Sequence, residues 1–266
     1  MRPLVSILAV LALFGAGCVS VPATADVIEV PGQYPTLAAA IRDAPDGATI
    51  RLEPGRYDGQ VLISRPLSIV AEPGTAEIIG APGATVISIT GTAGVTIQGL
   101  VVVGGDTGIA VMHSSGVSIA DNLITGSAHR GVDIVFGAAS VTGNRVTPAP
   151  GPYVIGIRVA NATSWPESVV SGNVVEHADA YGIAVNFANA MVKGNEVIGG
   201  NRAGIAINEM SLADVLGNTV NEAPRYGILV HDMSHAVVTD NHIIGADEPI
   251  KLTFHSTVEL SGNTTD

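Results

Sequence analysis

The segment YGIAVNFANAMVKGNEVI (181–198) carries a pattern that recurs through the chain and decides the fold. Its first part has the form G-[IV]-x-[VI]-x, in which every second residue is aliphatic. A second alternating run follows a short gap and ends in Asn, before a final x-[VI] pair. A period of two places side chains on one face of a β-strand, whereas a helix needs a period of 3.6. The segment therefore predicts short strands.

The pattern recurs at a nearly constant interval. Four further copies are TGIAVMHSSGVSIADNLI (107–124), RGVDIVFGAASVTGNRV (130–146), AGIAINEMSLADVLGNTV (203–220) and YGILVHDMSHAVVTDNHII (226–244). The asparagines are Asn122, Asn144, Asn173, Asn195, Asn218, Asn241 and Asn263, at spacings of 22, 29, 22, 23, 23 and 22. The leading glycines are Gly108, Gly131, Gly156, Gly182, Gly204 and Gly227, and Pro249 takes the next place. Such a period with short β-segments predicts a solenoid, because no repeat can bury its apolar edge alone.

An all-β parallel β-helix fits the repeat. A repeat of about 22 residues has room for three short strands. The regularly spaced leucines of a leucine-rich repeat are absent. A helical repeat would need a hydrophobic period of 3.6 residues, whereas the period here is two. Ile109, Val111 and Ile119 are expected in aliphatic stacks inside the coil. The asparagines are expected to form a ladder, each amide bonding its counterpart one coil away, about 4.8 Å along the axis.

Two parts of the chain depart from the repeat. The 29-residue step predicts loops near Pro148–Pro152 and Ala162–Ser168, the second carrying Trp165. Near the N-terminus, residues 36–44 place Leu37, Ala40, Ile41 and Ala44 on one helical face. We expect this helix to cover the open end of the solenoid, which is otherwise an exposed strand edge. The expected organisation is a signal over 1–25, an N-terminal strand and capping helix over 26–48, and the β-helix over 49–266.

The first residues predict export. A charged start at Arg2, an apolar run over 4–14 and small residues thereafter are typical of a secretory signal. Two processing sites remain open: cleavage after Ala25, or a lipobox-like site that leaves a lipidated Cys18. Cys18 is the only cysteine, so the chain forms no internal disulfide. No later run is long enough for a transmembrane span, so we expect a periplasmic, secreted or outer-envelope-attached protein.

Composition excludes two classes of protein. A hydrophobic content of 47% with 14% charged residues is too apolar for a disordered chain. The formal net charge of −12, from 24 acidic and 12 basic residues, argues against a nucleic-acid partner, whose phosphates need a basic surface.

The opening of the chain resembles a known superfamily. PTLAAAIRDAPDGATIRLEPGRYDGQVLISRPLSIVAE (35–72) and GVTIQGLVVVGG (94–105) are similar to right-handed parallel β-helix proteins of the pectin-lyase-like superfamily. The similarity is greatest to the carbohydrate-binding and sugar-hydrolase type, which includes the NosD family, and covers roughly 27–266. It implies an extracytoplasmic protein that handles a polysaccharide in a groove along one sheet. NosD-like members imply instead a periplasmic protein partner in copper-site maturation.

The outward positions of the repeat give candidate binding residues. The second outward position of successive repeats places Asn186, Asn208 and His231 in one polar row. Rings stack on sugar faces and amides bond hydroxyls, so this row predicts a sugar groove. The remaining candidates flank the row or bring positive charge, and they are Glu209, Asp232, Phe187, Arg158 and Lys251. Alternatively, these residues are ordinary members of an exposed sheet face, with Arg158 simply paired to Asp133.

The segment YGILVHDMS (226–234) resembles the Asp-Pro-His-Asp motif of mannuronan C5-epimerases. His231 and Asp232 match its His and final Asp, whereas Leu229 and Val230 replace the first Asp and the Pro. The resemblance implies a lyase or epimerase step in which a base removes the proton beside a uronate carboxylate. His231 and Tyr226 would then carry protons, with Asp232 beside them and Asn186, Asn208 or Lys251 holding the carboxylate. Whether the protein is an enzyme stays open, as does a purely structural role in the envelope.

No metal motif stands out. The histidines show no H-x-H or HExxH spacing, and no D-x-D-x-D calcium loop is present. We predict no metal site, with a soft copper site near Met210, His231, Met233 and His235, or a bound calcium, as the open alternatives.

Overall fold

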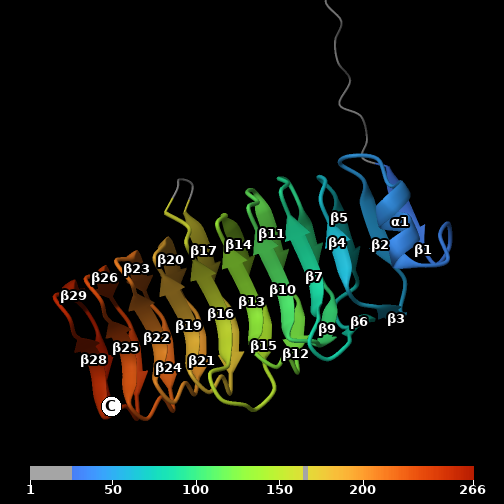
Figure 1. Ribbon diagram of the computed structural model, residues 1–266. Helices are drawn as coiled ribbons and strands as arrows, with labels where there is room; N and C mark the ends of the chain where they lie inside the picture. The colour runs from blue at the N-terminus through green and yellow to red at the C-terminus, as the bar shows by residue number, and fades with distance from the viewer. Residues whose placement is uncertain (1–25, 164–166) are drawn as a thin grey trace, which may run out of the picture.

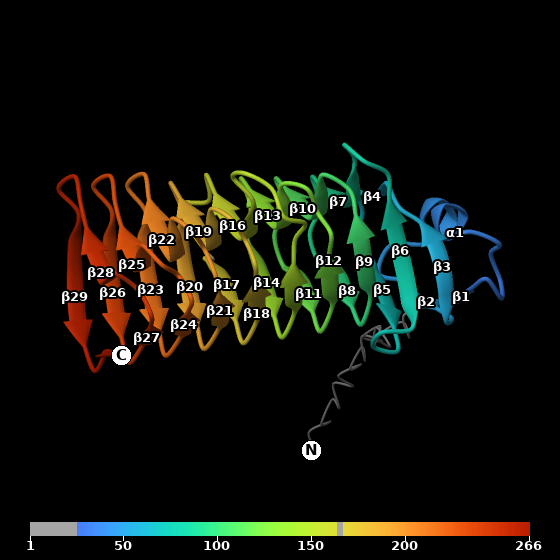
Figure 2. The ribbon, with the colours of Figure 1, turned by 90° about the horizontal axis from the view of Figure 1, so that it is seen from below.

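The structure is a computed structural model that describes residues 26–163 and 167–266. The predicted export signal with Cys18, and Trp165, lie outside the described residues. The chain winds into a solenoid of three parallel sheets, with each strand paired to the equivalent strands one coil before and after (Figures 1 and 2). Within the described ranges, no helix is long and apolar enough to cross a membrane. The predicted all-β, right-handed parallel β-helix is confirmed.

Each coil contributes one strand to each sheet. Sheet A contains β1 (Val27–Val30), β2 (Thr49–Leu52), β5 (Ser68–Ala71), β8 (Thr96–Gln98), β11 (Val117–Ala120), β14 (Ala139–Thr142), β17 (Ser168–Ser171), β20 (Asn189–Lys193), β23 (Leu212–Leu216), β26 (His235–Thr239) and β29 (Thr257–Ser261). Sheet B contains β3 (Gly55–Asp58), β6 (Ala76–Gly80), β9 (Val101–Gly104), β12 (Leu123–Thr125), β15 (Arg145–Thr147), β18 (Val174–Glu176), β21 (Glu196–Ile198), β24 (Thr219–Asn221), β27 (His242–Ile244) and β30 (Thr264–Thr265). Sheet C contains β4 (Val61–Ile63), β7 (Thr85–Thr90), β10 (Thr107–Met112), β13 (Arg130–Val135), β16 (Ile155–Ala160), β19 (Tyr181–Asn186), β22 (Ala203–Asn208), β25 (Tyr226–Val230) and β28 (Glu248–Leu252).

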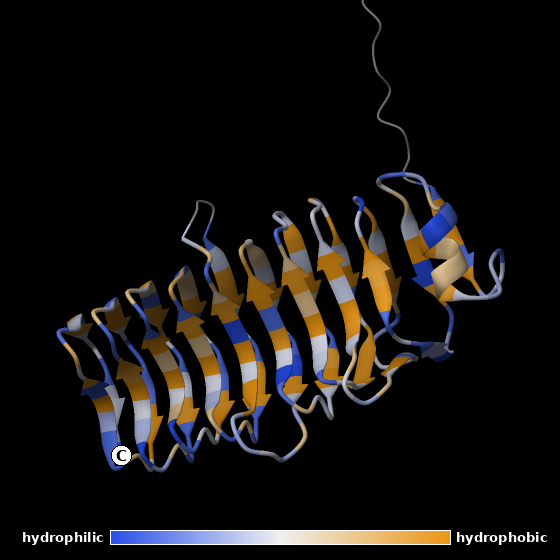
Figure 3. Ribbon diagram, in the orientation of Figure 1, coloured by the Kyte–Doolittle hydropathy of each residue, from blue (hydrophilic) through white to orange (hydrophobic). Residues whose placement is uncertain are grey.

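The aliphatic positions of the repeat form the core. In sheet C, Ile109 is in register with Ile87 before it and Val132 after it, and all three are fully buried. Val111 and Ile119 are likewise fully buried, as the repeat predicted. Residue hydropathy changes along the strands of sheet C (Figure 3), and the aliphatic positions of the repeat are buried in the core. The core is a continuous stack of small aliphatic side chains rather than a cluster of large rings.

The asparagine ladder is confirmed. Each amide Nδ2 donates to Oδ1 of the next asparagine at 2.9–3.0 Å, from Asn122 through to Asn263. The same Nδ2 donates to a backbone carbonyl, as when Asn122 bonds Ile97 at 3.0 Å. The amides thus satisfy backbone groups that the tight turn would otherwise bury without partners.

The leading glycine of each repeat is explained by lack of space. A Cβ atom on Gly156 would lie 2.2 Å from Cγ1 of Val175 and 2.6 Å from the carbonyl oxygen of Gly182. The equivalent Gly182 would meet Val197 and Gly204 in the same way. The starts of β16 and β19 therefore pass too close to their neighbours for a side chain at this position, whereas the last coil has Pro249 there.

Helix α1 (Leu37–Asp43) lies at the N-terminal end of the solenoid (Figure 1). Thr36 caps it by accepting a hydrogen bond from the backbone N–H of Ala39. The apolar face that the sequence indicated, Leu37, Ala40, Ile41 and Ala44, is buried against the first coils. The predicted insertion near Pro148–Pro152 is a loop between β15 and β16, on the side where the strands of sheet C begin.

Candidate functional site

The outer face of sheet C has a small-residue floor near its C-terminal end. Ala184 and Ala206 are neighbours in register on β19 and β22, and both are completely covered. Tyr181 and Tyr226, at the starts of β19 and β25, pack over this floor together with Leu229. Two phenol rings therefore stand on the outer surface rather than in the core.

Two arginines form a wall beside these rings. Arg202 directly precedes β22 and lies 5.1 Å from the ring centre of Tyr153, which comes from the loop between β15 and β16. Arg225 directly precedes β25 and lies 4.8 Å from the ring centre of Tyr226. The pKa of Arg202 is raised above its ordinary value, chiefly because its side chain hydrogen-bonds Tyr181. Both guanidinium groups are therefore fixed positive charges held against aromatic faces.

These side chains enclose a hollow of about 280 Å³. It is lined by Tyr181, Arg202, Arg225, Tyr226, Leu229, His231, Thr253 and Phe254. A hollow of about 310 Å³ lies between α1 and β3, but its arginine, Arg56, is paired with Glu77 at 3.0 Å. Among these two, the sheet C hollow is the one that combines unpaired cations with aromatic rings, so we take it as the candidate site.

Two of the predicted residues, Tyr226 and His231, line the hollow, one at the start of β25 and the other directly after its end. Asp232 does not line the hollow and lies beside His231. His231 contacts the Thr253 hydroxyl through Nδ1, and its Nε2 lies 3.2 Å from Oδ2 of Asp232. The ring of Phe254 meets His231 edge-on at 4.8 Å. Both ring nitrogens of His231 thus have partners, which fixes the orientation of the imidazole.

Asn186 and Asn208 are adjacent in register on the same face. Unlike the interior asparagines, they do not bond each other, and Oδ1 of each is buried without a hydrogen-bond partner among the described residues. Asn208 as a whole is only 5% exposed. An acceptor oxygen left without a donor in such a place costs free energy, and neither asparagine lines the hollow.

Glu209, Asp232 and Phe187 lie where the strands of sheet C end. Each has a left-handed backbone, with φ of 59°, 52° and 47°, so each turns the chain towards sheet A. Phe187 is 41% exposed, and Phe136 and Phe254 are exposed at the equivalent place in other coils. Exposed rings therefore edge sheet C on the side opposite the arginines.

Arg158 and Lys251 do not reach the hollow as free cations. Arg158 donates to both carboxylate oxygens of Asp133, at 2.7 and 3.0 Å, which confirms the expected pair. Lys251 donates to Glu248 at 2.6 Å, and this bond raises the pKa of the Lys251 ammonium.

Sequence reasoning missed Arg202 and Arg225. Both stand one residue ahead of the repeat pattern, in RAG (202–204) and RYG (225–227), and Arg130 stands at the equivalent edge in RGV (130–132). The recurring arginine at the entry of the repeat was the available signal. The cation–π contact with Tyr153 was not readable from sequence, because it joins the insertion loop to a later coil.

The described residues do not gather a metal centre of His, Cys, Asp or Glu, since no three of them lie close enough together. His231 and His235 each use Nδ1 on a threonine of the last coil, Thr253 and Thr257. Soft ligands do recur nearby: Met210, Met233 and His255 occupy equivalent left-handed turn positions in three successive coils and are exposed.

Solved structures with a similar fold include a pectate lyase, an alginate lyase and an alginate epimerase. A pectate lyase matches over 90% of this chain and 78% of its own, with a TM-score of 0.68 and 11% identity. An alginate lyase from Paenibacillus sp. matches over 90% of this chain and 95% of its own, with a TM-score of 0.58 and 17% identity. A periplasmic alginate epimerase matches over 83% of this chain but 60% of its own, with a TM-score of 0.60 and 13% identity. At these identities the likeness concerns the fold alone.

The chain thus has the fold of a right-handed parallel β-helix protein, which it shares with the pectate lyase and the alginate lyase structures. Within that class, the family model described as periplasmic copper-binding protein (NosD) matches residues 137–264, which run from the start of the β14 coil into β30. No curated protein sequence matches the chain.

Proposed function

We propose that the protein binds an acidic polysaccharide on the outer face of sheet C, outside the cytoplasm. One observation carries the proposal: Arg202 and Arg225 line an aromatic hollow in a chain whose net charge is −12. The cations of sheet C are Arg130, Arg158, Arg202, Arg225 and Lys251, five of the twelve basic residues in the chain. Asp133 and Glu248 neutralise Arg158 and Lys251, which leaves positive charge at the other three.

The hollow has the chemistry that an acidic sugar needs. Guanidinium groups bind carboxylate or sulfate oxygens through paired hydrogen bonds. The faces of Tyr181 and Tyr226 suit the C–H face of a pyranose ring. Asn186 and Asn208, predicted to bind sugar hydroxyls, do not line this hollow. The solved structures of similar fold include enzymes named for pectate and alginate, both acidic polymers.

The location is part of the proposal. The N-terminal sequence is typical of an exported protein, and the family model that matches is described as periplasmic. Fractionation of cells into cytoplasm, periplasm, membrane and medium tests it, and a Cys18→Ser variant tells a lipid anchor from a cleaved signal. Recovery of mature protein in the cytoplasm would refute this part.

Binding is tested by titration with alginate, polygalacturonate and a neutral glucan. We expect the two acidic polymers to bind and the neutral one not to bind. Arg202→Gln and Arg225→Gln should each weaken binding about tenfold, the change expected for one charge-assisted hydrogen bond. Lys193→Gln, which removes one charge from β20 of sheet A, is the matched control and should leave binding unchanged. Equal losses in all three variants would reduce the effect to net charge and reject the site.

Catalysis is a further part of the proposal. Tyr226 and His231 would transfer protons at the carbon beside a uronate carboxylate, with Asp232 orienting His231, in a lyase or epimerase reaction. Incubation with alginate and pectate, followed by the ultraviolet absorbance of unsaturated products and by NMR of the uronate composition, tests it. If the polymer is unchanged, the proposed lyase or epimerase activity is rejected and the proposal of glycan binding stands. Product that is lost in His231→Gln and Tyr226→Phe would support the assigned roles.

A second candidate function is docking to another periplasmic protein during copper-site assembly. The NosD match and the exposed column of Met210, Met233 and His255 favour it, because thioethers and imidazole are ligands of soft copper. Titration with Cu(I) against a chelator tests this role. Binding that is lost in a Met210→Leu, Met233→Leu double variant would support it, whereas equal binding by the variant would remove it.

A further inference from the structure

A second cationic position lies further along the same face. On β13 and β16, Arg130 and Arg158 share one carboxylate, that of Asp133, which is 8% exposed. Arg158 takes both oxygens of Asp133, whereas Nε of Arg130 stays 3.7 Å away. That Nε is buried and has no hydrogen-bond partner among the described residues. Two positive charges thus face one negative charge.

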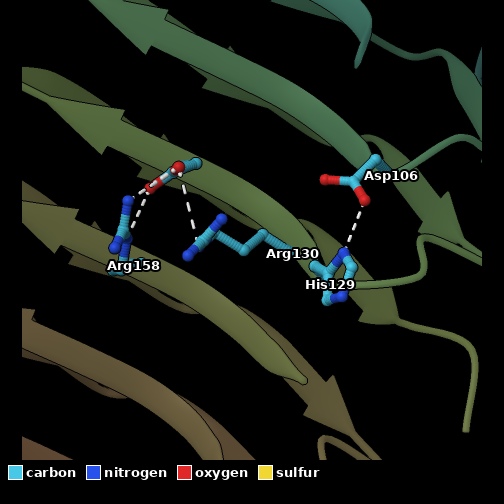
Figure 4. A network of polar contacts seen from close by, with 5 residues as sticks. Asp106, His129, Arg130 and Arg158 are labelled. Atoms are coloured by element: carbon cyan, nitrogen blue, oxygen red, sulfur yellow. Dashed lines mark hydrogen bonds and ion pairs between the residues drawn. The ribbon is translucent and has the colours of Figure 1, made fainter. Parts of the chain in front are cut away.

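The carboxylate of Asp106, one coil before Arg130, is already engaged. Asp106 accepts the backbone N–H of Arg130 through its carbonyl, but its carboxylate points at Nδ1 of His129. Figure 4 shows His129 facing Asp106 while the Arg130 side chain extends away from this pair towards the Arg158 side. The buried Nε of Arg130 cannot reach an external anion, but the side chain is 32% exposed, so its terminal nitrogens can.

The register of sheet C relates this position to the hollow. Arg130 is in register with Ile155, Ile155 with Tyr181, and Tyr181 with Ala203, the residue after Arg202. Three coil steps separate Arg130 from the arginine wall, which is about 14 Å at the spacing of neighbouring strands. A pyranose in an extended glycan is about as long as one step, ~5 Å, so the chain advances roughly one sugar per coil.

We propose that Arg130 is a second anionic subsite, and that the ligand is a polymer whose acidic groups recur along at least four consecutive sugars lying parallel to the solenoid axis. This inference rests on the proposed function, since it assumes that an acidic glycan occupies the hollow. A glycan with acidic groups only at one end, or a single charged monosaccharide, fills the hollow alone. A homopolymeric uronan fills both positions at once.

Oligomers of mannuronate or galacturonate, from the disaccharide to the hexasaccharide, test the inference by titration calorimetry. The affinity should rise about tenfold or more once the oligomer is long enough to reach Arg130, at four or five sugars. Arg130→Gln should abolish this rise and leave the disaccharide affinity unchanged, while Arg130→Lys should restore part of it. Arg145→Gln, which removes an arginine from β15 of sheet B, should not alter the rise.

The outcomes separate the two proposals. If every oligomer binds with the same affinity, or if Arg130→Gln weakens short and long oligomers equally, the second subsite is refuted while glycan binding in the hollow stands. If no acidic oligomer or polymer binds at all, the proposed function itself fails. Thermal unfolding of the Arg130 variants shows whether the fold is intact, because Asp133 loses a neighbour in them.

Discussion

The backbone N–H and the side-chain amide of Asn195 both donate to a single oxygen, Oδ1 of Asn218, at 2.9 Å each. One side chain thus fastens the next coil through two bonds. The oxygen and both donors are buried, so water cannot take over if the oxygen is removed.

We predict that Asn218→Leu destabilises the protein by about 2–4 kcal/mol. Two donors of Asn195 and the Val192 carbonyl that Asn218 bonds would lose a buried partner. Chemical denaturation measures the change. Asn221→Leu, at the partly exposed end of β24, is the control and should change stability by less than ~1 kcal/mol. A similar loss in both variants would contradict the special role of the ladder.

The leading glycines give a second prediction. In Gly182→Ala the new Cβ would sit 2.2 Å from Cγ1 of Val197 and 2.8 Å from the Gly204 carbonyl oxygen, so we expect a loss of about 1–3 kcal/mol or more. Gly151→Ala places its Cβ at an ordinary 3.5 Å from Val154, in a loop, and should be nearly neutral. Thermal melts of the two variants decide the matter. A harmless Gly182→Ala would show that the strand starts can move apart.

Tyr57 gives a prediction that depends on pH. Its hydroxyl donates to the carbonyls of Val30 and Glu53, at 2.9 and 2.7 Å, and joins β3 to the end of β1. Burial raises the pKa of Tyr57 above 10.0, and the nearby Glu53 carboxylate adds to this. The neutral phenol is thus favoured by folding. Its contribution is fully present below pH 10.0 and is lost as the pH rises through the higher folded-state pKa.

We expect Tyr57→Phe to lose about 1–2 kcal/mol at neutral pH, because two carbonyls lose their donor. The difference from the parent should shrink as the pH rises beyond 10.0. Denaturation curves at neutral and alkaline pH measure it. A difference that grows with pH would mean that the assigned sign is wrong.

The salt dependence of the affinity for an acidic glycan should show whether Arg202 and Arg225 bind the ligand by charge. Counterions and salt weaken contacts between exposed charges, so the affinity for an acidic polymer should fall as ionic strength rises. Arg202→Gln should reduce the slope of affinity against salt, whereas Lys193→Gln should leave it unchanged. An affinity that salt does not alter would point to apolar stacking on Tyr181 and Tyr226 instead of ion pairing.

The sequence contains most of the fold but only part of the site. The asparagine period and the alternation of Ile109 and Val111 predict coils, sheets and register, because each follows from local spacing alone. Tyr226 and His231 were predicted as site residues, and both line the hollow, Tyr226 at the start of β25 and His231 directly after its end, while their chemical role stays a prediction. Arg202 gains its meaning only from Tyr153, which lies 49 positions earlier in the chain and reaches it through an insertion. A repeat pattern predicts the features that all coils share. The candidate site consists of residues that occur in single coils, so the pattern does not predict it.

The leading glycines of the repeats limit how the length of this protein can change. Since each strand start fits tightly between its neighbours, a segment shorter than a coil has to leave the solenoid, as residues 148–153 do between β15 and β16. Duplication of a whole repeat, by contrast, recreates its own asparagine, its own glycine and one more rung of the outer face. Gene duplication can therefore lengthen this protein by whole coils, and each added coil extends the outer face of sheet C by one strand.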